Sequence, residues 1–139
     1  MMILEKLSYF FTVFFFFIVL SYYFLLFIKK KKPERNKSFS SLTVIIPAHN
    51  EEMYIKEAVD SVIAADFKGS KEIIIVDDGS IDSTAKIASQ YASKNIKLIR
   101  TKHSGKSASI NRALKLAKGE LIAIVDGDSC IHKEALVEM

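Results

Sequence analysis

The sequence is poor in the residues that build disulfide frameworks and zinc sites. It has one cysteine, Cys130, and three histidines that lie far apart along the chain. A single cysteine excludes an intramolecular disulfide, and the histidine spacing does not match a zinc site. The chain therefore fits a reducing compartment. We expect Cys130 to be a packed side chain and each histidine to be a loop residue that forms hydrogen bonds.

Two phosphate-binding fingerprints are also missing. No G-x-G-x-x-G segment occurs, so the sequence gives no support for a dinucleotide-binding fold. Gly105, Lys106 and Ser107 look like the end of a P-loop, but Arg100 stands where that motif requires its first glycine. Lys106 is left with two interpretations, a cation near a diphosphate or a solvated lysine at the start of a helix.

Charged residues are absent from a long apolar run near the N-terminus. Residues 7–28 contain no acidic or basic side chain and would span roughly 33 Å as a helix, which is enough to cross a membrane. A cleaved signal peptide would carry basic residues before its apolar run, whereas here they follow it. Residues 1–28 are therefore predicted to form an uncleaved membrane anchor.

A basic segment follows the apolar run. Residues 29–37 contain six lysines and arginines against one glutamate, and residues 38–139 carry a formal charge of −1. The positive-inside rule then predicts a single-pass protein of the cell membrane whose globular part is cytoplasmic. The basic residues abut the span and the rest of the chain has no basic stripe, so lipid headgroups are the expected partner and nucleic acid is not. Residues 29–41 are interpreted as a linker.

The pattern of the sequence changes after this linker. Four short runs rich in isoleucine and valine predict strands, at residues 42–47, 72–77, 96–100 and 121–126. Helical periodicity lies between them, at residues 51–65, 84–91 and 106–117. Strands that alternate with helices predict an α/β domain over residues 42–139, with a mostly parallel sheet and right-handed crossovers.

Polar residues follow the carboxyl end of each predicted strand, the edge where open parallel sheets bind ligands. Asp126 and Asp128 flank Gly127 at the end of the last strand. Two carboxylates at this spacing suit Mg²⁺ or Mn²⁺, which complete their shells with phosphate oxygens. The alternative is a turn that only closes the strand. The convergence of four polar loops on one edge favours the metal site.

A second acidic pair, Asp77 and Asp78, follows a strongly apolar strand. Adjacent acids are costly there unless they are exposed or bonded to another group. One of the two can accept a hydrogen bond from a pyrimidine base. Ser80 or Asp82 is expected to cap the helix that follows.

Residues 41–139 resemble family 2 glycosyltransferases of the GT-A fold, a group that includes membrane-bound polysaccharide synthases. Four motifs in the family's order carry the resemblance: TVIIPAHNEE, EIIIVDDGSIDST, SGKSASINRALKLAKGE and LIAIVDGDS. The resemblance implies a Rossmann-like GT-A sheet with flanking helices, incomplete at this length. It also implies a nucleotide-sugar donor, commonly UDP-linked, and a glycan or lipid-linked acceptor.

The resemblance assigns roles to individual residues. Those implied to border the donor nucleotide are Pro47, Asn50, Glu51, Asp77, Asp78, Lys106, Asn111 and Asp126. Asp126 and Asp128 match the family's D-x-D motif, which contacts the ribose and binds Mn²⁺ or Mg²⁺. The family's general base lies well downstream of this motif, so it is expected beyond Met139 or on a second chain.

Two other functions stay open at this point. A membrane-tethered nucleotide-binding fragment or partner subunit without turnover would keep the same donor motifs. A haloacid-dehalogenase-like phosphohydrolase also has an apolar strand that ends in D-x-D, but there Thr or Val usually follows the second Asp at the position of Cys130. For any of these functions, the free edge of a four-stranded parallel sheet predicts self-association or instability of the isolated globular part.

Overall fold

The computed structural model describes residues 2–27 and 39–137, which belong to two separate compact units. The first unit is one helix, α1 (Met2–Phe27), and its segment Met2–Leu25 is long and apolar enough to cross a membrane. Thr12 donates its hydroxyl to the carbonyl of Ser8, so this polar group is satisfied within the apolar helix. Residues 28–38, which include most of the predicted linker, lie outside the described residues.

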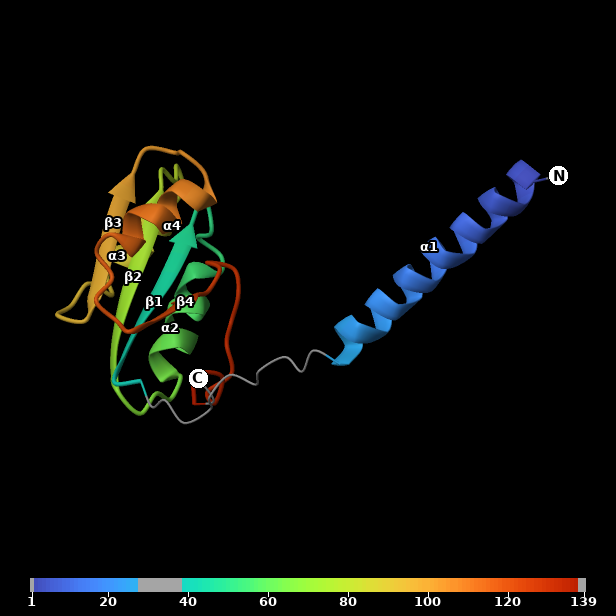
Figure 1. Ribbon diagram of the computed structural model, residues 1–139. Helices are drawn as coiled ribbons and strands as arrows, with labels where there is room; N and C mark the ends of the chain where they lie inside the picture. Colours follow the sequence, from blue (N-terminus) through green and yellow to red (C-terminus); the bar gives the residue numbers. More distant parts are fainter. Residues whose placement is uncertain (1, 28–38, 138–139) are drawn as a thin grey trace. The chain divides into compact units, whose positions relative to one another are not determined.

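The second unit contains a fully parallel four-stranded sheet (Figure 1). Its strands are β1 (Ser41–Ala48), β2 (Ser70–Asp78), β3 (Ile96–Thr101) and β4 (Leu121–Ile124). Their order in the sheet is β3-β2-β1-β4, so β1 and β2 are the central strands. Both are buried almost without interruption, as expected for strands covered on two faces. The four predicted strands and their parallel pairing are confirmed.

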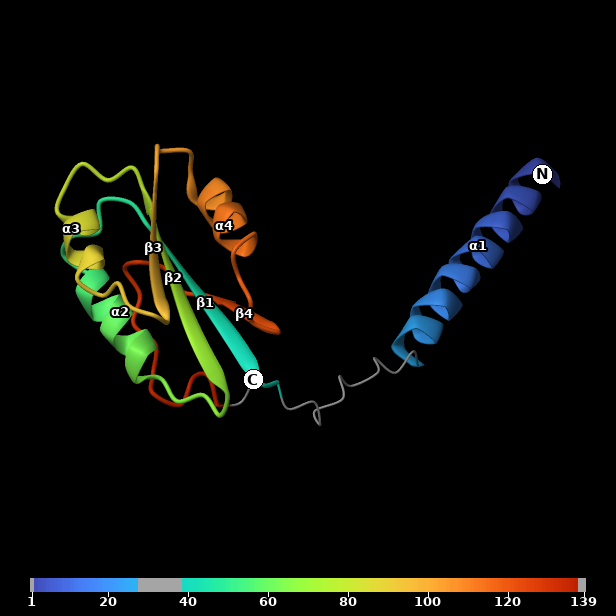
Figure 2. The same cartoon turned by 90° about the vertical axis from the view of Figure 1, so that its left-hand side faces the viewer.

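Helices cover both faces of this sheet. They are α2 (Ile55–Ala64), α3 (Thr84–Ser89) and α4 (Lys106–Leu114). Figure 2 shows α2 and α3 on one side of the strands and α4 on the other. The larger apolar core lies under α2 and α3, and a smaller one, which includes Ile45, Ile74, Val76 and Ala113, lies under α4. The chain therefore changes face between β3 and β4.

Helix α2 shows why this sequence is helical and where it stops. Its buried residues recur at three- and four-residue spacing: Ile55, Ala58, Val59 and Val62. At its C-terminal end, the ammonium of Lys71 donates to the carbonyls of Val62, Ile63 and Ala65 at 2.7, 3.0 and 2.6 Å. These carbonyls have no partner inside the helix, so Lys71 both satisfies them and complements the helix dipole.

The helices are shorter than predicted. The carbonyl of Glu51 accepts from the amides of both Tyr54 and Ile55, so the chain forms a turn before α2 begins at Ile55. At the other end of the fold, the amides of Leu116 and Ala117 both donate to the carbonyl of Ala113 and close α4 in a turn. Apolar periodicity continued through these turns, which is why it overestimated both helices.

The two edges of the sheet differ in chemistry. Strand β3 carries Lys97 and Arg100, and charged side chains discourage pairing with another strand. Strand β4 has the sequence LIAI and no charge. Its Ile122 and Ile124 are 40% and 49% exposed, because α4 packs on β1 and β2 instead. The free apolar edge predicted from the sequence is therefore present at β4.

Candidate functional site

A cavity of about 210 Å³ lies at the carboxyl ends of β1 and β4. The crossover from β1 leads through α2 to β2 on one side, whereas β4 lies on the other side of β1 and is reached through α4. Such a reversal of strand order opens a crevice at the strand ends, which is the usual ligand site of open α/β sheets. Six predicted site residues line the cavity: Pro47, Glu51, Asp78, Lys106, Asp126 and Asp128.

Gly127 explains how the two aspartates of the D-x-D segment reach this cavity. After β4 the chain stays hydrogen-bonded to β1, through the amides of Val125 and Gly127 and the carbonyls of Ile45 and Pro47. A β-carbon at Gly127 would lie 3.0 Å from the side chain of Ala48 and 3.1 Å from the Pro47 carbonyl oxygen. The close approach of the two strands here therefore favours glycine, and it holds the flanking carboxylates at the cavity.

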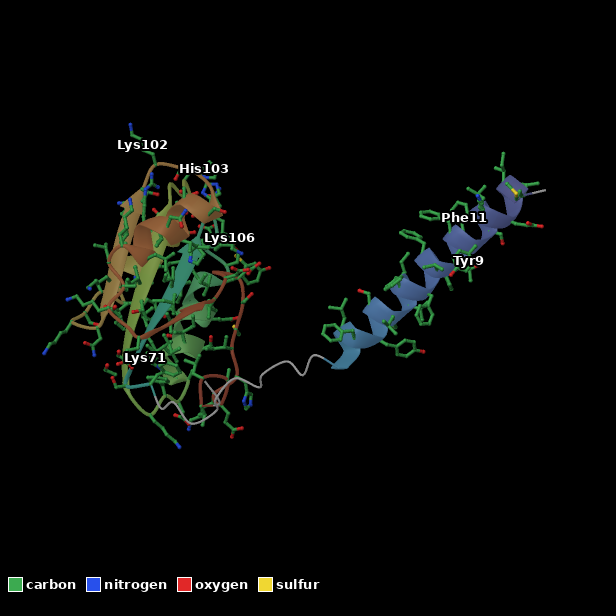
Figure 3. The ribbon with its side chains drawn as sticks, in the orientation of Figure 1. Tyr9, Phe11, Lys71, Lys102, His103 and Lys106 are labelled. Atoms are coloured by element: carbon green, nitrogen blue, oxygen red, sulfur yellow. The ribbon has the colours of Figure 1, made fainter. Side chains whose placement is uncertain are left out.

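The β4 end of the cavity concentrates negative charge. Burial raises the pKa of Glu51, and the nearby charges of Asp128, Asp82 and Asp126 raise this pKa further. The Nζ of Lys106 lies 2.6 Å from Oδ1 of Asp126 and neutralises part of this charge. Figure 3 shows Lys106 at the end of the sheet to which the strand arrows point, with Lys71 at the opposite end.

This donor set fits a hard divalent cation that shares its shell with a ligand. Asp126 and Asp128 offer carboxylate oxygens, the ligands that Mg²⁺ and Mn²⁺ prefer. Within residues 2–27 and 39–137, no cluster of three or more His, Cys, Asp or Glu side chains could hold a metal ion by itself. The residues present therefore suit an ion that takes its remaining ligands from water and from phosphate oxygens.

Asp78 forms the opposite wall of the cavity and is almost fully buried. Its carboxylate accepts hydrogen bonds from the amides of Ser104 and Gly105 at 3.0 and 2.8 Å and from the hydroxyl of Thr101 at 3.2 Å. Burial alone would raise the pKa of Asp78, but these hydrogen bonds hold the pKa well below its usual range. The hydroxyl of buried Ser109 lies beside the same carboxylate without a hydrogen bond of good geometry.

Two histidines complete this wall, and their role in the cavity was not predicted. The rings of His49 and His103 stack with centroids 4.1 Å apart, and both rings line the cavity. Each ring directs Nδ1 to the main-chain oxygen of Asp78, at 2.8 and 3.2 Å. The expectation that they form hydrogen bonds from loops is correct. Their positions, directly after the parallel strands β1 and β3 on either side of β2, were the available signal.

Three predicted site residues lie outside this cavity. Asn50 has φ 56° and uses its side-chain oxygen to accept from the amide of Ile81, so it ties two loops together. Asp77 is buried at a second cavity, where Oδ2 lies 3.5 Å from Nε of Arg100. Asn111 is exposed on α4.

Other local predictions were partly wrong. Ser80 does not cap α3, because its hydroxyl oxygen accepts from the amide of Asn50. Asp82 does bond to the first turn of that helix, through the amide of Thr84 at 2.9 Å. Cys130 is exposed rather than packed, because the chain beyond Gly127 leaves the sheet.

Known proteins share this arrangement. Residues 43–139 match the family model described as glycosyl transferase family 2. The chain is 41% identical over 98 residues to the poly(ribitol-phosphate) beta-N-acetylglucosaminyltransferase TarS of Staphylococcus aureus, an alignment that covers 68% of this chain. The chain spans only 17% of the length of that relative.

Two solved structures give the same picture. A crystal structure of S. aureus TarS residues 1–349 in complex with UDP-GlcNAc matches 70% of this chain and 29% of its own chain, with TM-score 0.65 and 39% identity. A mannosyltransferase from Pyrobaculum calidifontis in complex with GDP-Man and Mn²⁺ matches 80% of this chain and 35% of its own, with TM-score 0.59 and 30% identity. Both likenesses extend over most of the globular unit.

Proposed function

Because the chain belongs to glycosyl transferase family 2, we propose that it supplies the donor-binding half of an enzyme that transfers a sugar from a UDP-linked donor to a glycan or lipid-linked acceptor. The convergence of six predicted residues on one cavity at the strand-order reversal is the observation that carries this proposal. The S. aureus relative crystallised with UDP-GlcNAc supports a UDP-linked donor. Family membership removes the phosphohydrolase alternative.

Asp126 and Asp128 are proposed to hold Mn²⁺ or Mg²⁺ in this site. The carboxylates lie where the cavity is most acidic, and the mannosyltransferase neighbour was solved with Mn²⁺. A bound divalent ion would neutralise the charge that builds on a departing nucleoside diphosphate. Lys106 has a flexible side chain whose ammonium lies at the same carboxylate, so it can also contact a phosphate there.

The remaining cavity residues are proposed to bind and orient the nucleotide. Pro47, Glu51 and Asp78 line the cavity directly. Asn50 shapes the loop that follows β1, while Asp77 and Asn111 belong to the proposed donor site only by the family resemblance. The proposal assigns none of the cavity residues to general-base catalysis of the acceptor hydroxyl.

We place this activity at the cell membrane, with α1 as a single-pass anchor and the globular unit in the cytoplasm. The support is the apolar character of Met2–Leu25 together with the basic residues 29–37 that follow it in the sequence. Carbonate extraction of membranes from expressing cells tests the anchor. A chain that partitions into the soluble fraction, or that lacks its first 28 residues, would contradict it.

Calorimetric titration of the detergent-solubilised full chain with UDP, with and without Mn²⁺, tests the donor site. The proposal predicts binding that needs the metal and that is lost in Asp126→Asn and Asp128→Asn. Asp60→Asn serves as the matched control, because Asp60 bonds to Lys56 and Tyr91 on the α2 side of the fold. Folded wild-type protein that binds no UDP in either condition would overturn the proposal. Binding that survives both cavity substitutions would move the site elsewhere.

A further inference from the structure

We propose that Asp78 is a positioning residue, which fixes the loop before α4 and both imidazoles of the cavity wall instead of contacting the nucleotide. The inference rests on the proposed function and concerns the same cavity. Two kinds of contact carry it. The carboxylate of Asp78 is filled by donors from one loop, and its main-chain oxygen is shared by two stacked rings.

The carboxylate of Asp78 has no acceptor site left for a ligand. An ionised carboxylate offers about four acceptor positions. The amides of Ser104 and Gly105 and the hydroxyls of Thr101 and Ser104 already occupy them, at 2.8 to 3.2 Å. Nδ1 of His103 adds a fifth contact, 3.0 Å from Oδ2. With 4% of the side chain exposed, the group is buried by the loop that it holds.

The main-chain oxygen of Asp78 sets the protonation of the two rings. A carbonyl oxygen only accepts, so Nδ1 of His49, 2.8 Å away, must carry the proton. Nε2 of the neutral ring is then an acceptor, which agrees with the side-chain nitrogen of Asn50 lying 3.2 Å from it. The same argument applies to His103, whose Nδ1 lies 3.2 Å from this oxygen. Asp78 thus orients both rings in one tautomer.

The loop that Asp78 holds leads directly into the cavity. Gly105 has φ 89° and ends the loop, and the next residue, Lys106, lines the cavity. The loop also packs tightly against the end of β2, since a β-carbon at Gly79 would lie 2.5 Å from the amide nitrogen of His103. Release of this loop would therefore displace the start of α4 together with Lys106, without removing any ligand contact made by Asp78 itself.

The substitution Asp78→Asn in the full chain separates positioning from direct contact. Without nucleotide, we expect the Ser104 and Gly105 amides to exchange hydrogen roughly tenfold faster or more, because charge-assisted bonds to a buried acceptor are lost. In ¹⁵N spectra, His103 should lose its preference for the Nδ1-protonated tautomer, while His49 should keep it because its acceptor is the main chain. UDP affinity should fall as well.

A second variant leaves Asp78 in place. Thr101→Val removes one hydroxyl from the carboxylate, and positioning predicts faster exchange at Gly105 and a smaller loss of UDP affinity than in Asp78→Asn. Asp60→Asn should change none of these signals. Lost UDP binding with unchanged ligand-free exchange and tautomers would overturn positioning and make Asp78 a direct ligand contact. The ligand-free readouts decide the inference even where the wild type binds no UDP, an outcome that overturns only the proposed function. If Asp78→Asn does not fold, unaltered exchange in Thr101→Val would overturn it.

Discussion

Replacement of Lys106 by methionine should separate stability from donor binding. The pair that its ammonium forms with Asp126 is short, 2.6 Å, but the two side chains are 58% and 46% exposed. Exposed ion pairs contribute less than about 1 kcal/mol to folding. We therefore expect Lys106→Met to leave the free energy of unfolding within about 1 kcal/mol of wild type, as measured by urea unfolding followed by circular dichroism.

Donor binding should respond far more strongly to the same change. A hydrogen bond from a charged group is worth about 1.5 to 3 kcal/mol, so loss of the ammonium should weaken UDP roughly 10- to 100-fold. Uridine, which lacks the diphosphate, should bind both proteins equally. Calorimetry at two salt concentrations measures both effects, because the contribution of an exposed charge declines as salt rises.

A matched control comes from the same helix segment. Lys115 follows α4 directly, is exposed and does not line the cavity. Lys115→Met should therefore bind UDP like wild type. Equal weakening of UDP and uridine by Lys106→Met would refute the assignment of Lys106 to the diphosphate, and an unchanged UDP affinity would restore its interpretation as a solvated helix-start lysine.

Three further predictions concern the fold. Lys71→Met should lower the free energy of unfolding by about 1.5 to 3 kcal/mol, because three carbonyls at the end of α2 lose a charged donor, whereas exposed Lys68→Met should not. Burial alone would raise the pKa of Glu72, but hydrogen bonds lower this pKa overall, so its stabilising effect is present above the ordinary value of 4.5 and lost as pH falls through the lowered value. The stability gap between wild type and Glu72→Gln, read from unfolding curves, should therefore close in acid and stay constant near neutrality. Sedimentation of the globular unit without α1 should show self-association that Ile122→Lys and Ile124→Lys reduce, and a monodisperse wild-type monomer would contradict this prediction.

The sequence predicted the strands well because burial on two faces leaves a direct trace. Residues 73–76 of β2 are all apolar and all at most 3% exposed. Helix ends were harder, because the turn before α2 depends on the backbone of Glu51 and on the positive φ of Asn50. Apolar periodicity contains no information about either feature.

The site was predictable as a set of loops and less so as a set of contacts. Asp77 and Asp78 are neighbours in β2, so their side chains point to opposite faces of the sheet and only one can line a given cavity. Asp78 lines the cavity near α4, and Asp77 lies with Arg100 at the other one. The stacked histidines needed the strand order as well, because β1 and β3 flank β2 only after the sheet is assembled.

The most direct test of the account is to locate a bound Mn²⁺ ion by NMR. In the full chain with UDP present, substoichiometric Mn²⁺ should first broaden the amide signals of Gly127 and Ala48, which adjoin the proposed carboxylate pair. Excess Mg²⁺ should restore these signals, and Asp128→Asn should abolish the effect. Broadening centred elsewhere, or uniform broadening that Asp128→Asn leaves unchanged, would contradict a metal-dependent donor site at the end of β4.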